Sequence, residues 1–255
     1  KTKEMPDDAT TVIMGINEEM YDNKKHLLIS GASCTTTCLA HMMKPLLDYF
    51  GAEKILSVSM TTVHAVTASQ QVLDRVPKAD AKDFRKIRSA MNNIILTSTG
   101  AANTLAVVIP EMKNIGFIAQ SVRVPIITGS LIILVVAFKD EEGNIINKDL
   151  INKIYMDASE RETRGYLFFT LDQQVSTDIV SFFGPAAIIE GSETHTRTAM
   201  ITLDISNMCV MGSLTVDKIQ IPVTQAVIYG WYDNELGSYT NMLGDLTVKI
   251  SKDLY

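Results

Sequence analysis

Long runs of β-branched or alternating residues fill the second half of the chain, and they narrow its possible folds more than any other feature. Such runs predict strands at residues 117–124, 130–138, 197–205, 208–214 and 223–231. The most apolar stretch, from Ile126 to Phe138, is shorter than the ~20 residues of a membrane span, so it predicts a buried strand. The residues EEGN at 141–144 are typical of a hairpin turn. We therefore expect a sheet of several long strands.

Segments with helical periodicity interrupt these strands and are expected to cover the sheet. Apolar residues recur at spacings of three and four between Cys34 and Tyr49, which predicts a helix. Ser33 can serve as its N-cap, and Phe50-Gly51 ends the pattern. Further helices are predicted over residues 101–108, 148–160 and 235–254, with another from Asp83 to Met91. The expected fold class is α+β, with a largely antiparallel or mixed sheet covered by helices.

The N-terminal part holds two short strand-like stretches, Val12–Gly15 and Leu27–Ser30. Nothing earlier in the chain would pair with them, which suggests that the sequence begins inside a domain. The N-terminus has no apolar core of the signal-peptide type, and no glycine-rich G-x-G-x-x-G or P-loop motif occurs anywhere. If the protein uses a dinucleotide, its phosphate-binding fingerprint lies outside this chain.

The net charge restricts the binding partners expected for the protein, and the cysteine content indicates the redox state of its cellular compartment. The 255 residues carry a formal net charge of −6, so no basic face is implied and neither nucleic acid nor membrane is an expected partner. An anionic substrate would need a local group of hydrogen-bond donors, because the net negative charge of the chain does not attract an anion. The cysteines Cys34, Cys38 and Cys209 cannot form a disulfide framework, which fits a reducing compartment such as the cytoplasm.

Cys34 is the first candidate for chemistry, because it stands at the predicted start of a helix. The helix dipole and the free N–H groups there favour a thiolate and can bind an anion. Ser33 and Thr35 flank the thiol with hydroxyl donors. A buried cysteine behind an ordinary serine cap remains an equal alternative. Cys38 and His41 share the helix face of Cys34, but we do not expect a metal, because no second cluster completes four ligands.

His64 is the candidate base, since it ends a predicted strand and precedes a Thr-rich turn, where catalytic side chains tend to lie. It needs only to approach Cys34 in space. A structural histidine is the alternative for His64 alone. His26 and His41 are expected at the surface, and His195 has no predicted chemical role.

Two further features could bind an anion. Hydroxyls and a glycine at residues 97–102 precede a predicted helix, which they would also cap in the ordinary way. Arg123 ends an apolar strand, where its guanidinium could clamp a phosphate or carboxylate, or simply pair with an acid. The basic cluster Arg85-Lys86-Arg88 is more typical of a solvated helix face.

These pieces occur together in one family. The segments SCTTTC, TTVHAVTA, TSTGAA, VRVP and WYDNELGSYTNMLGDL resemble the phosphorylating glyceraldehyde-3-phosphate dehydrogenases, in the same order and at similar spacings. The resemblance covers nearly the whole chain and implies the fold of that family's C-terminal catalytic domain, with remnants of a Rossmann domain at both ends. It implies that residues 1–33 end the NAD-binding domain, 34–232 form the catalytic domain, and 233–255 form a helix returning to the NAD-binding domain.

The resemblance also assigns roles to individual residues. It makes Cys34 the nucleophile and His64 its base. The expected site for inorganic phosphate is made by Ser33, Thr35, Thr99 and Gly100, and the site for the substrate phosphate by Thr67 and Arg123. Lys86 stands where many members have an arginine. The lysine keeps the positive charge but lacks the planar guanidinium group with its fork of N–H donors. Asn234 matches the residue that contacts the nicotinamide amide.

The sequence departs from the family pattern in three places. Thr37 stands where asparagine is usual, and the stretch after Arg123, PIITGSLIILVVAF, differs from that of many members. Ser238 shifts the aromatic residue after NELG by one position, to Tyr239. Tyr239 is therefore the expected cofactor contact, although the nicotinamide stacking of relatives need not carry over.

The implied function is oxidation of glyceraldehyde 3-phosphate with inorganic phosphate to an acyl phosphate, through a Cys34 hemithioacetal and thioester, with hydride transfer to NAD or NADP, in glycolysis or gluconeogenesis. A homotetramer is implied as well. We expect the 255 residues alone not to be a competent dehydrogenase. The alternatives are an erythrose-4-phosphate dehydrogenase, a cysteine acyl-hydrolase using Cys34 and His64 without a nicotinamide, and a non-catalytic interaction domain.

Overall fold

A mixed sheet forms the centre of the molecule. The structure is a computed structural model that describes residues 6–141, 145–180, 182–205 and 218–253. Within these residues, the sheet has eight strands in the order β4-β5-β3-β6-β10-β8-β7, with β9 paired to β10. The strands are β3 (Ile55–His64), β4 (Ile95–Thr97), β5 (Gly116–Arg123), β6 (Ser130–Lys139), β7 (Leu167–Thr170), β8 (Ala187–Glu190), β9 (His195–Asp204) and β10 (Lys218–Tyr232). The β3–β5 and β7–β8 pairs are parallel and the others antiparallel, which confirms the predicted α+β class.

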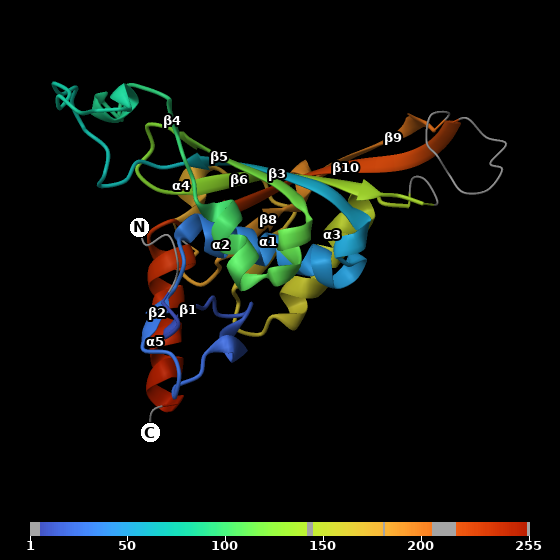
Figure 1. Ribbon diagram of the computed structural model, residues 1–255, viewed down its shortest axis with the longest axis horizontal. Coiled ribbons are helices and arrows are strands. Elements are labelled where there is room, and N and C mark those ends of the chain that lie inside the picture. Colours follow the sequence, from blue (N-terminus) through green and yellow to red (C-terminus); the bar gives the residue numbers. More distant parts are fainter. Residues whose placement is uncertain (1–5, 142–144, 181, 206–217, 254–255) are drawn as a thin grey trace.

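Helices α1 (Cys34–Phe50), α2 (Ala101–Val108) and α3 (Lys148–Arg161) cover one face of this sheet, and in the described residues the opposite face has no helical layer (Figure 1). The remaining helices are α4 (Ser176–Ile179) and α5 (Met242–Asp253), with a π-helix at Leu236–Asn241 directly before α5. Short 3-10 turns occupy Glu18–Met20, Ala52–Lys54, Phe84–Ile87, Pro110–Asn114 and Gly191–Glu193. None of the helices in the described part of the chain is long and apolar enough to cross a membrane.

Helix α1 lies at the centre of the core because nearly its whole circumference is apolar or small. Its apolar side chains Leu39, Met42 and Leu46 are fully buried against the sheet. Gly230 in β10 permits this close packing, since a Cβ there would overlap the sulfur of Met42. The predicted N-cap and C-terminal glycine of α1 are confirmed, and the helix extends one residue beyond the predicted range. Ser33 Oγ accepts a hydrogen bond from Thr36 N at 3.2 Å, and Gly51 ends the helix with a positive φ of 75°.

The N-terminal strands differ from the prediction. The strands are β1 (Ala9–Thr11) and β2 (Leu28–Ser30), and they pair with each other in parallel. Residues 9–11 precede both predicted stretches and pair with β2, so the expectation that nothing earlier in the chain would pair with them is wrong for Leu27–Ser30. The predicted strand at 12–15 is instead a buried turn after β1. That turn is fixed by Asn17, whose side-chain oxygen accepts from Ile13 N at 2.8 Å. Figure 1 shows β1, β2 and α5 close together at one side of the molecule.

Two other predicted elements need correction, and two lie mostly or wholly outside the described residues. Asp83 does cap a turn, accepting from Arg85 N at 3.1 Å, but the helix expected up to Met91 is only the 3-10 turn Phe84–Ile87. The helix predicted at 235–254 begins as the π-helix Leu236–Asn241 and continues as α5, with Leu246 buried and Tyr239 41% exposed. The predicted strand at 208–214 and most of the predicted hairpin at 141–144 lie outside the described residues.

Candidate active site

The structure brings Cys34 and His64 together. Cys34 is the first residue of α1, and His64 is the last residue of β3. The Cys34 Sγ atom lies 3.5 Å from His64 Nε2, within hydrogen-bond distance for sulfur. The pair forms because the N-terminus of α1 and the C-terminal end of β3 meet on the helix-covered side of the sheet. A thiol in contact with an imidazole at a helix start is the arrangement of a nucleophile and its base.

His64 is buried and held by its surroundings. It is 3% exposed, its Nδ1 lies 2.7 Å from Ala65 O, and its ring meets the Tyr232 ring edge-on at 5.9 Å between centroids. The pKa of His64 is lowered to about 4, because burial and the neighbouring charge of Arg123 together outweigh the hydrogen bond to Ala65 O, which raises it. His64 is therefore a neutral imidazole at neutral pH, as a proton acceptor must be.

The thiol of Cys34 shows two opposing effects. Burial raises the pKa of Cys34 above its ordinary value of 9.0 because it disfavours the thiolate. Hydrogen bonds from Thr35 and the charge of Arg123 act in the opposite direction. We expected the helix start to favour a thiolate. In this structure burial outweighs that effect, so the resting pair is a thiol beside a neutral imidazole.

The hydroxyls predicted to bind inorganic phosphate around Cys34 already have partners. Ser33 Oγ is the N-cap of α1 and also lies 2.8 Å from Thr36 Oγ1. Thr35 Oγ1 lies 3.0 Å from the hydroxyl of Tyr232, which in turn lies 2.8 Å from Thr62 Oγ1. An anion here would bind chiefly to the backbone N–H groups of the first helical turn. Sequence reasoning missed Tyr232, because nothing in its local pattern indicates that it ties α1 to β3.

The other predicted phosphate residues lie in two loops. Thr99 Oγ1 accepts from Ala101 N at 3.2 Å, and Gly100 is the N-cap of α2, with nothing within 4 Å of where a Cβ would be. Thr67 lies in the loop after β3, with its Oγ1 3.1 Å from Ser69 Oγ. Each position agrees with the predicted helix start or turn, and binding of phosphate there stays a prediction.

Arg123 stands directly beside His64, because the two residues are paired across β3 and β5. Its Nη1 donates to Ala65 O at 3.0 Å and contacts His64 Nδ1. Arg123 also lines a cavity of about 200 Å³, whose wall is formed by Ser69, Gln70, Lys86, Arg88, Ile95, Thr97, Ser98 and Arg123. Among the described residues, Arg123 and Lys86 form no ion pair with a carboxylate, whereas Arg88 pairs with Asp74. The expected alternative of an Arg123–acid pair is therefore absent from the described part of the chain.

The two predicted nicotinamide contacts differ in their surroundings. Ala65 N donates to Ser130 Oγ at 3.1 Å, and Ser130 Oγ donates to Asn234 Oδ1 at 2.8 Å, which fixes the Asn234 amide close to the His64 loop. This leaves its Nδ2 as an oriented donor, which fits the carbonyl of a nicotinamide amide. Tyr239 lies in the π-helix and is partly exposed, while its neighbour Ser238 is fully buried and donates to Ala186 O.

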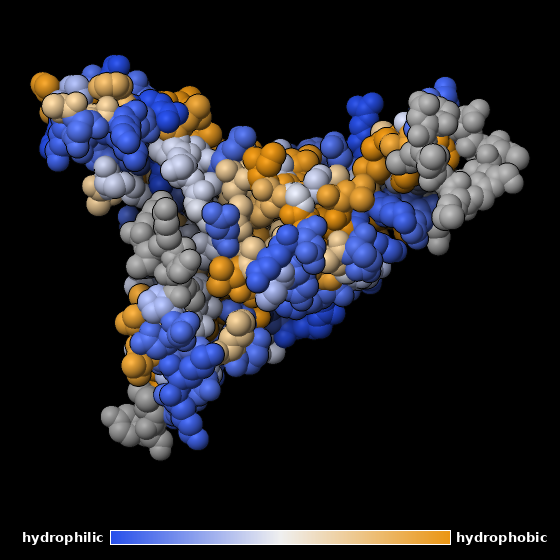
Figure 2. All heavy atoms as spheres, viewed as in Figure 1, coloured by the Kyte–Doolittle hydropathy of each residue, from blue (hydrophilic) through white to orange (hydrophobic). Residues whose placement is uncertain are grey.

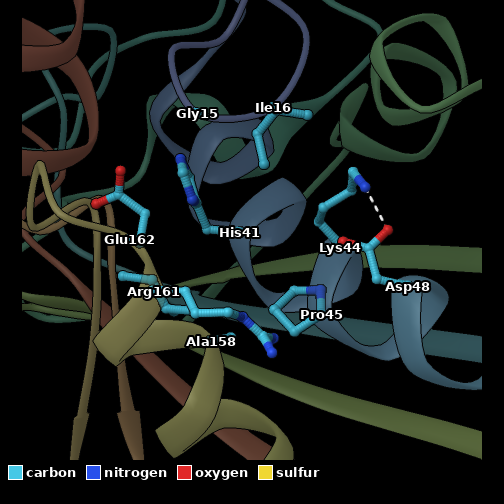
Figure 3. A pocket seen from close by; sticks show the side chains of 10 residues that line it. Gly15, Ile16, His41, Lys44, Pro45, Asp48, Ala158, Arg161 and Glu162 are labelled. Carbon is cyan, nitrogen blue, oxygen red and sulfur yellow. Dashed lines mark hydrogen bonds and ion pairs between the residues drawn. The ribbon is translucent and has the colours of Figure 1, made fainter.

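His41 is not at the surface, contrary to expectation. It is 3% exposed, its Nε2 lies 3.1 Å from Met14 O, and burial lowers its pKa to about 4. The turn after β1 closes over this side of α1, which the helical periodicity did not reveal. Figure 3 shows His41 under Gly15 at a separate pocket, with Arg161 extending toward Pro45. Within the described residues, no cluster of His, Cys, Asp and Glu could hold a metal ion.

Comparison with known proteins shows the family of the chain. Residues 33–234 match the family model for the glyceraldehyde 3-phosphate dehydrogenase C-terminal domain. The chain is 40% identical over 248 residues to glyceraldehyde-3-phosphate dehydrogenase 2 of Streptomyces avermitilis, covering 97% of this chain and 63% of that protein. It is 36% identical over 243 residues to glyceraldehyde-3-phosphate dehydrogenase 1 of Bacillus subtilis, covering 95% and 61%. The chain thus spans less than two thirds of the length of these relatives. It belongs to the glyceraldehyde-3-phosphate dehydrogenase family, an oxidoreductase family, and carries its C-terminal domain.

Proposed function

We propose that this chain is the catalytic part of a glyceraldehyde-3-phosphate dehydrogenase, with Cys34 as nucleophile and His64 as general base. The observation that carries the proposal is the 3.5 Å approach of Cys34 Sγ to His64 Nε2, with Arg123 on the other side of the imidazole. A thiol, a neutral base and an adjacent guanidinium suit an aldehyde that carries a phosphate. The substrate is then glyceraldehyde 3-phosphate, with inorganic phosphate as co-substrate.

The first step forms a bond between Cys34 and the aldehyde. His64 Nε2 takes the thiol proton, the thiolate attacks the carbonyl carbon, and the imidazolium returns the proton to the carbonyl oxygen, giving a hemithioacetal. The backbone N–H of Cys34 lies at the helix start, where it has no intrahelical acceptor, and can donate to the developing oxyanion. Such a donor is worth ~3–4 kcal/mol in the transition state.

In the second step the hemithioacetal becomes a thioester. A nicotinamide, when bound, supplies the acceptor for the hydride that leaves the substrate carbon. His64 takes the hydroxyl proton as that hydride leaves. Asn234 offers an oriented donor to the amide of the ring, and Tyr239 offers a partly exposed aromatic side chain. We propose NAD or NADP as the cofactor.

In the last step inorganic phosphate attacks the thioester carbon. The carbon–sulfur bond breaks, Cys34 leaves as a thiolate, and a proton returns to it through His64, while the product is an acyl phosphate. We place the attacking phosphate at the starts of α1 and α2, near Ser33, Thr35, Thr99 and Gly100. The phosphate of the substrate lies near Thr67, Lys86 and Arg123. Cys34 must remain a free thiol, so we propose a reducing, cytoplasmic setting.

The proposal is tested by acyl transfer, which needs no nicotinamide. The chain is incubated with 3-phosphoglyceroyl phosphate, and its mass is measured with and without added inorganic phosphate. We expect one acyl group on Cys34, none in the Cys34→Ser variant, and release that depends on inorganic phosphate. Release by water at an equal rate in the absence of phosphate would instead indicate a cysteine acyl-hydrolase. No acylation at Cys34 would refute the catalytic role.

A further inference from the structure

The turn Thr128-Gly129-Ser130 lies in the stretch where the sequence departs from the family pattern, and it leads into β6. Gly129 has a positive φ of 82°, and a Cβ there would overlap the backbone oxygen of Ser176 at the start of α4. Only glycine therefore satisfies both the conformation and the space at this position. Thr128 Oγ1 donates to Asp233 Oδ1 at 3.4 Å. These contacts fix the turn before β6 begins.

The hydroxyl of Ser130 joins two segments that are far apart in the sequence. The side chain is fully buried, and its Oγ accepts from Ala65 N at 3.1 Å and donates to Asn234 Oδ1 at 2.8 Å. A peptide N–H can only donate, so the oxygen accepts from Ala65 and its single proton is left for Asn234. The described residues give this hydroxyl no other acceptor. A reversed Asn234 amide would leave the buried proton without an acceptor, so the hydroxyl sets the direction of that amide.

Asn234 is held through its backbone as well as through its side chain. Its neighbour Asp233 is buried, and Asp233 Oδ1 accepts from Glu235 N at 2.9 Å and from Leu236 N at 3.0 Å. The Asn234 side chain is only 8% exposed, yet its Nδ2 forms no hydrogen bond with the described residues. The result is an amide donor with a fixed direction and no partner within the described part of the chain.

On its other side, Ser130 holds the backbone that follows His64. Ala65 is fully buried, and its N–H has the Ser130 hydroxyl as acceptor. Ala65 O accepts from Arg123 Nη1 at 3.0 Å and lies 2.7 Å from His64 Nδ1. Removal of the Ser130 hydroxyl would leave a buried N–H without an acceptor, which is unfavourable, so the Ala65 backbone that contacts His64 would shift.

We propose that Ser130 is a positioning residue for both halves of the reaction, because its one hydroxyl fixes the backbone beside His64 and the direction of the Asn234 amide. The inference rests on the proposed function, in which His64 serves Cys34 and Asn234 binds the amide of a nicotinamide. Ser130 itself touches none of the reacting atoms. Without its hydroxyl, acyl transfer to Cys34 becomes slower at an unchanged affinity for the acyl donor, and the Asn234 amide is no longer held in one direction.

The first test measures single-turnover acylation by 3-phosphoglyceroyl phosphate over a range of concentrations, for the unmodified chain, Ser130→Ala and Thr224→Ala. Thr224 is the matched control, because its hydroxyl is also fully buried and donates to Asp140 Oδ2 at 2.8 Å. It lies across from Phe138, at the other end of β6 from Ser130.

In Ser130→Ala we expect the maximum rate of acylation to fall roughly two- to tenfold, the size expected for one hydrogen bond, with an unchanged half-saturating concentration. Thr224→Ala should keep both values, although it also loses a buried hydroxyl. An unchanged maximum rate in Ser130→Ala would overturn the inference, and so would an equal loss of rate in Thr224→Ala, which would indicate a general effect of stability.

The second test measures the mobility of the Asn234 amide by the heteronuclear NOE of its Nδ2 in the chain labelled with ¹⁵N-asparagine. The signal is assigned by its loss in Asn234→Asp. We expect a rigid amide in the unmodified chain and in Thr224→Ala, and a mobile amide in Ser130→Ala. A rigid amide in Ser130→Ala would overturn the inference. A mobile amide in the unmodified chain would do so as well, and that measurement is decisive even if Ser130→Ala does not fold.

The two proposals fail in different ways. If the unmodified chain accepts no acyl group at Cys34, the proposed function is refuted. If Cys34 is acylated normally and neither its rate nor the Asn234 amide responds to Ser130→Ala, only the role of Ser130 is refuted.

Discussion

At position 34, burial and the helix terminus act on the same thiol in opposite directions. The start of α1 offers free N–H groups, and Arg123 adds a positive charge nearby, but desolvation dominates and raises the pKa of Cys34. In the proposed mechanism the thiolate is therefore formed during the reaction, by proton transfer to a neutral His64. This places the activation of the nucleophile within the reaction itself.

The pH dependence of alkylation follows from this balance. Because the pKa of Cys34 is raised from 9.0, its thiolate fraction in the chain without anions should still be rising at pH 9. We expect the rate of Cys34 alkylation by iodoacetamide, followed by peptide mass spectrometry, to increase steadily from pH 7 to beyond pH 9. A rate that levels off near neutral pH would show that the thiolate already dominates at rest.

Two buried histidines should make stability sensitive to acid. The pKa of both His41 and His64 is lowered from 6.5 to about 4 in the folded chain, so the unfolded chain takes up protons first as the pH falls. The contribution of each histidine to the free energy of unfolding is fully present above about pH 6.5. It is lost as the pH falls toward 4, and the loss is about 3 kcal/mol for each group.

The matched variants are His41→Gln and His195→Gln, the second at an exposed site. Urea unfolding between pH 7 and 4 should show a shallower loss of stability in His41→Gln, while His195→Gln follows the unmodified chain. Parallel profiles for all three proteins would mean that His41 does not carry a lowered pKa.

At the scale of single elements, the start of α1 is the feature on which the site depends. Its first residue is the proposed nucleophile, its N-cap is Ser33, and Tyr232 holds its first turn to β3 through Thr35 and Thr62. A small movement of this turn would change the distance between Cys34 Sγ and His64 Nε2. Capping of α1 should therefore affect reactivity as well as stability.

Ser33→Ala and Asn147→Ala separate these two effects. Both side chains cap a helix, since Ser33 Oγ accepts from Thr36 N in α1 and Asn147 Oδ1 accepts from Leu150 N in α3. Each change should cost about 1 kcal/mol in the free energy of unfolding. Only Ser33→Ala should also slow acylation of Cys34 by 3-phosphoglyceroyl phosphate. Equal acylation rates in the two variants would show that the cap does not position the sulfur.

Elements with strong local signals could be predicted from the sequence, and elements set by tertiary contacts could not. Helix α2 matches its predicted range, and α1 and β6 differ from theirs by a single C-terminal residue, because caps, a glycine and alternating residues mark their limits. The strands β1 and β2 have three residues each, too few to show a period, so their pairing was not predictable. The pairing of β3 with β5, which places Arg123 beside His64, likewise depends on the whole sheet.

In the candidate site, too, features with a local sequence signal could be predicted, and features set by tertiary contacts could not. Cys34 and His64 could be proposed from a helix start and a strand end, and the structure brings them together. The engagement of the Thr35 hydroxyl by Tyr232 and the burial of His41 come from chain segments far away in the sequence. Local patterns carry no information about such contacts, which explains why these features were missed.

At the scale of the whole molecule, the sheet has a covered face and an uncovered one. Figure 2 shows apolar surface over β3, β6 and β10 and again along the projecting β9–β10 hairpin. In that hairpin Ile201 faces Ile221 and Leu203 faces Ile219 across the two strands, and three of these side chains are more than 40% exposed. Apolar surface of this kind is typical of a protein interface, which agrees with the oligomer that the family resemblance implies.

Self-association of the chain should depend on this hairpin face. Leu203→Glu places a charge among the exposed apolar side chains, whereas Thr202→Glu places the same charge on the opposite face of β9. In sedimentation velocity experiments we expect the unmodified chain and Thr202→Glu to associate, and Leu203→Glu to shift toward the monomer. Equal association of both variants would exclude the hairpin face as a contact.

The most direct test of the whole account is the rate at which Cys34 accepts an acyl group when the imidazole at position 64 is removed. Single-turnover acylation by 3-phosphoglyceroyl phosphate is compared for the unmodified chain, His64→Gln and His195→Gln. A general base contributes roughly 10²–10⁴-fold, so His64→Gln should be slower by at least about 10²-fold, with His195→Gln unchanged. Equal rates for the unmodified chain and His64→Gln would contradict the assignment of Cys34 and His64 as nucleophile and base.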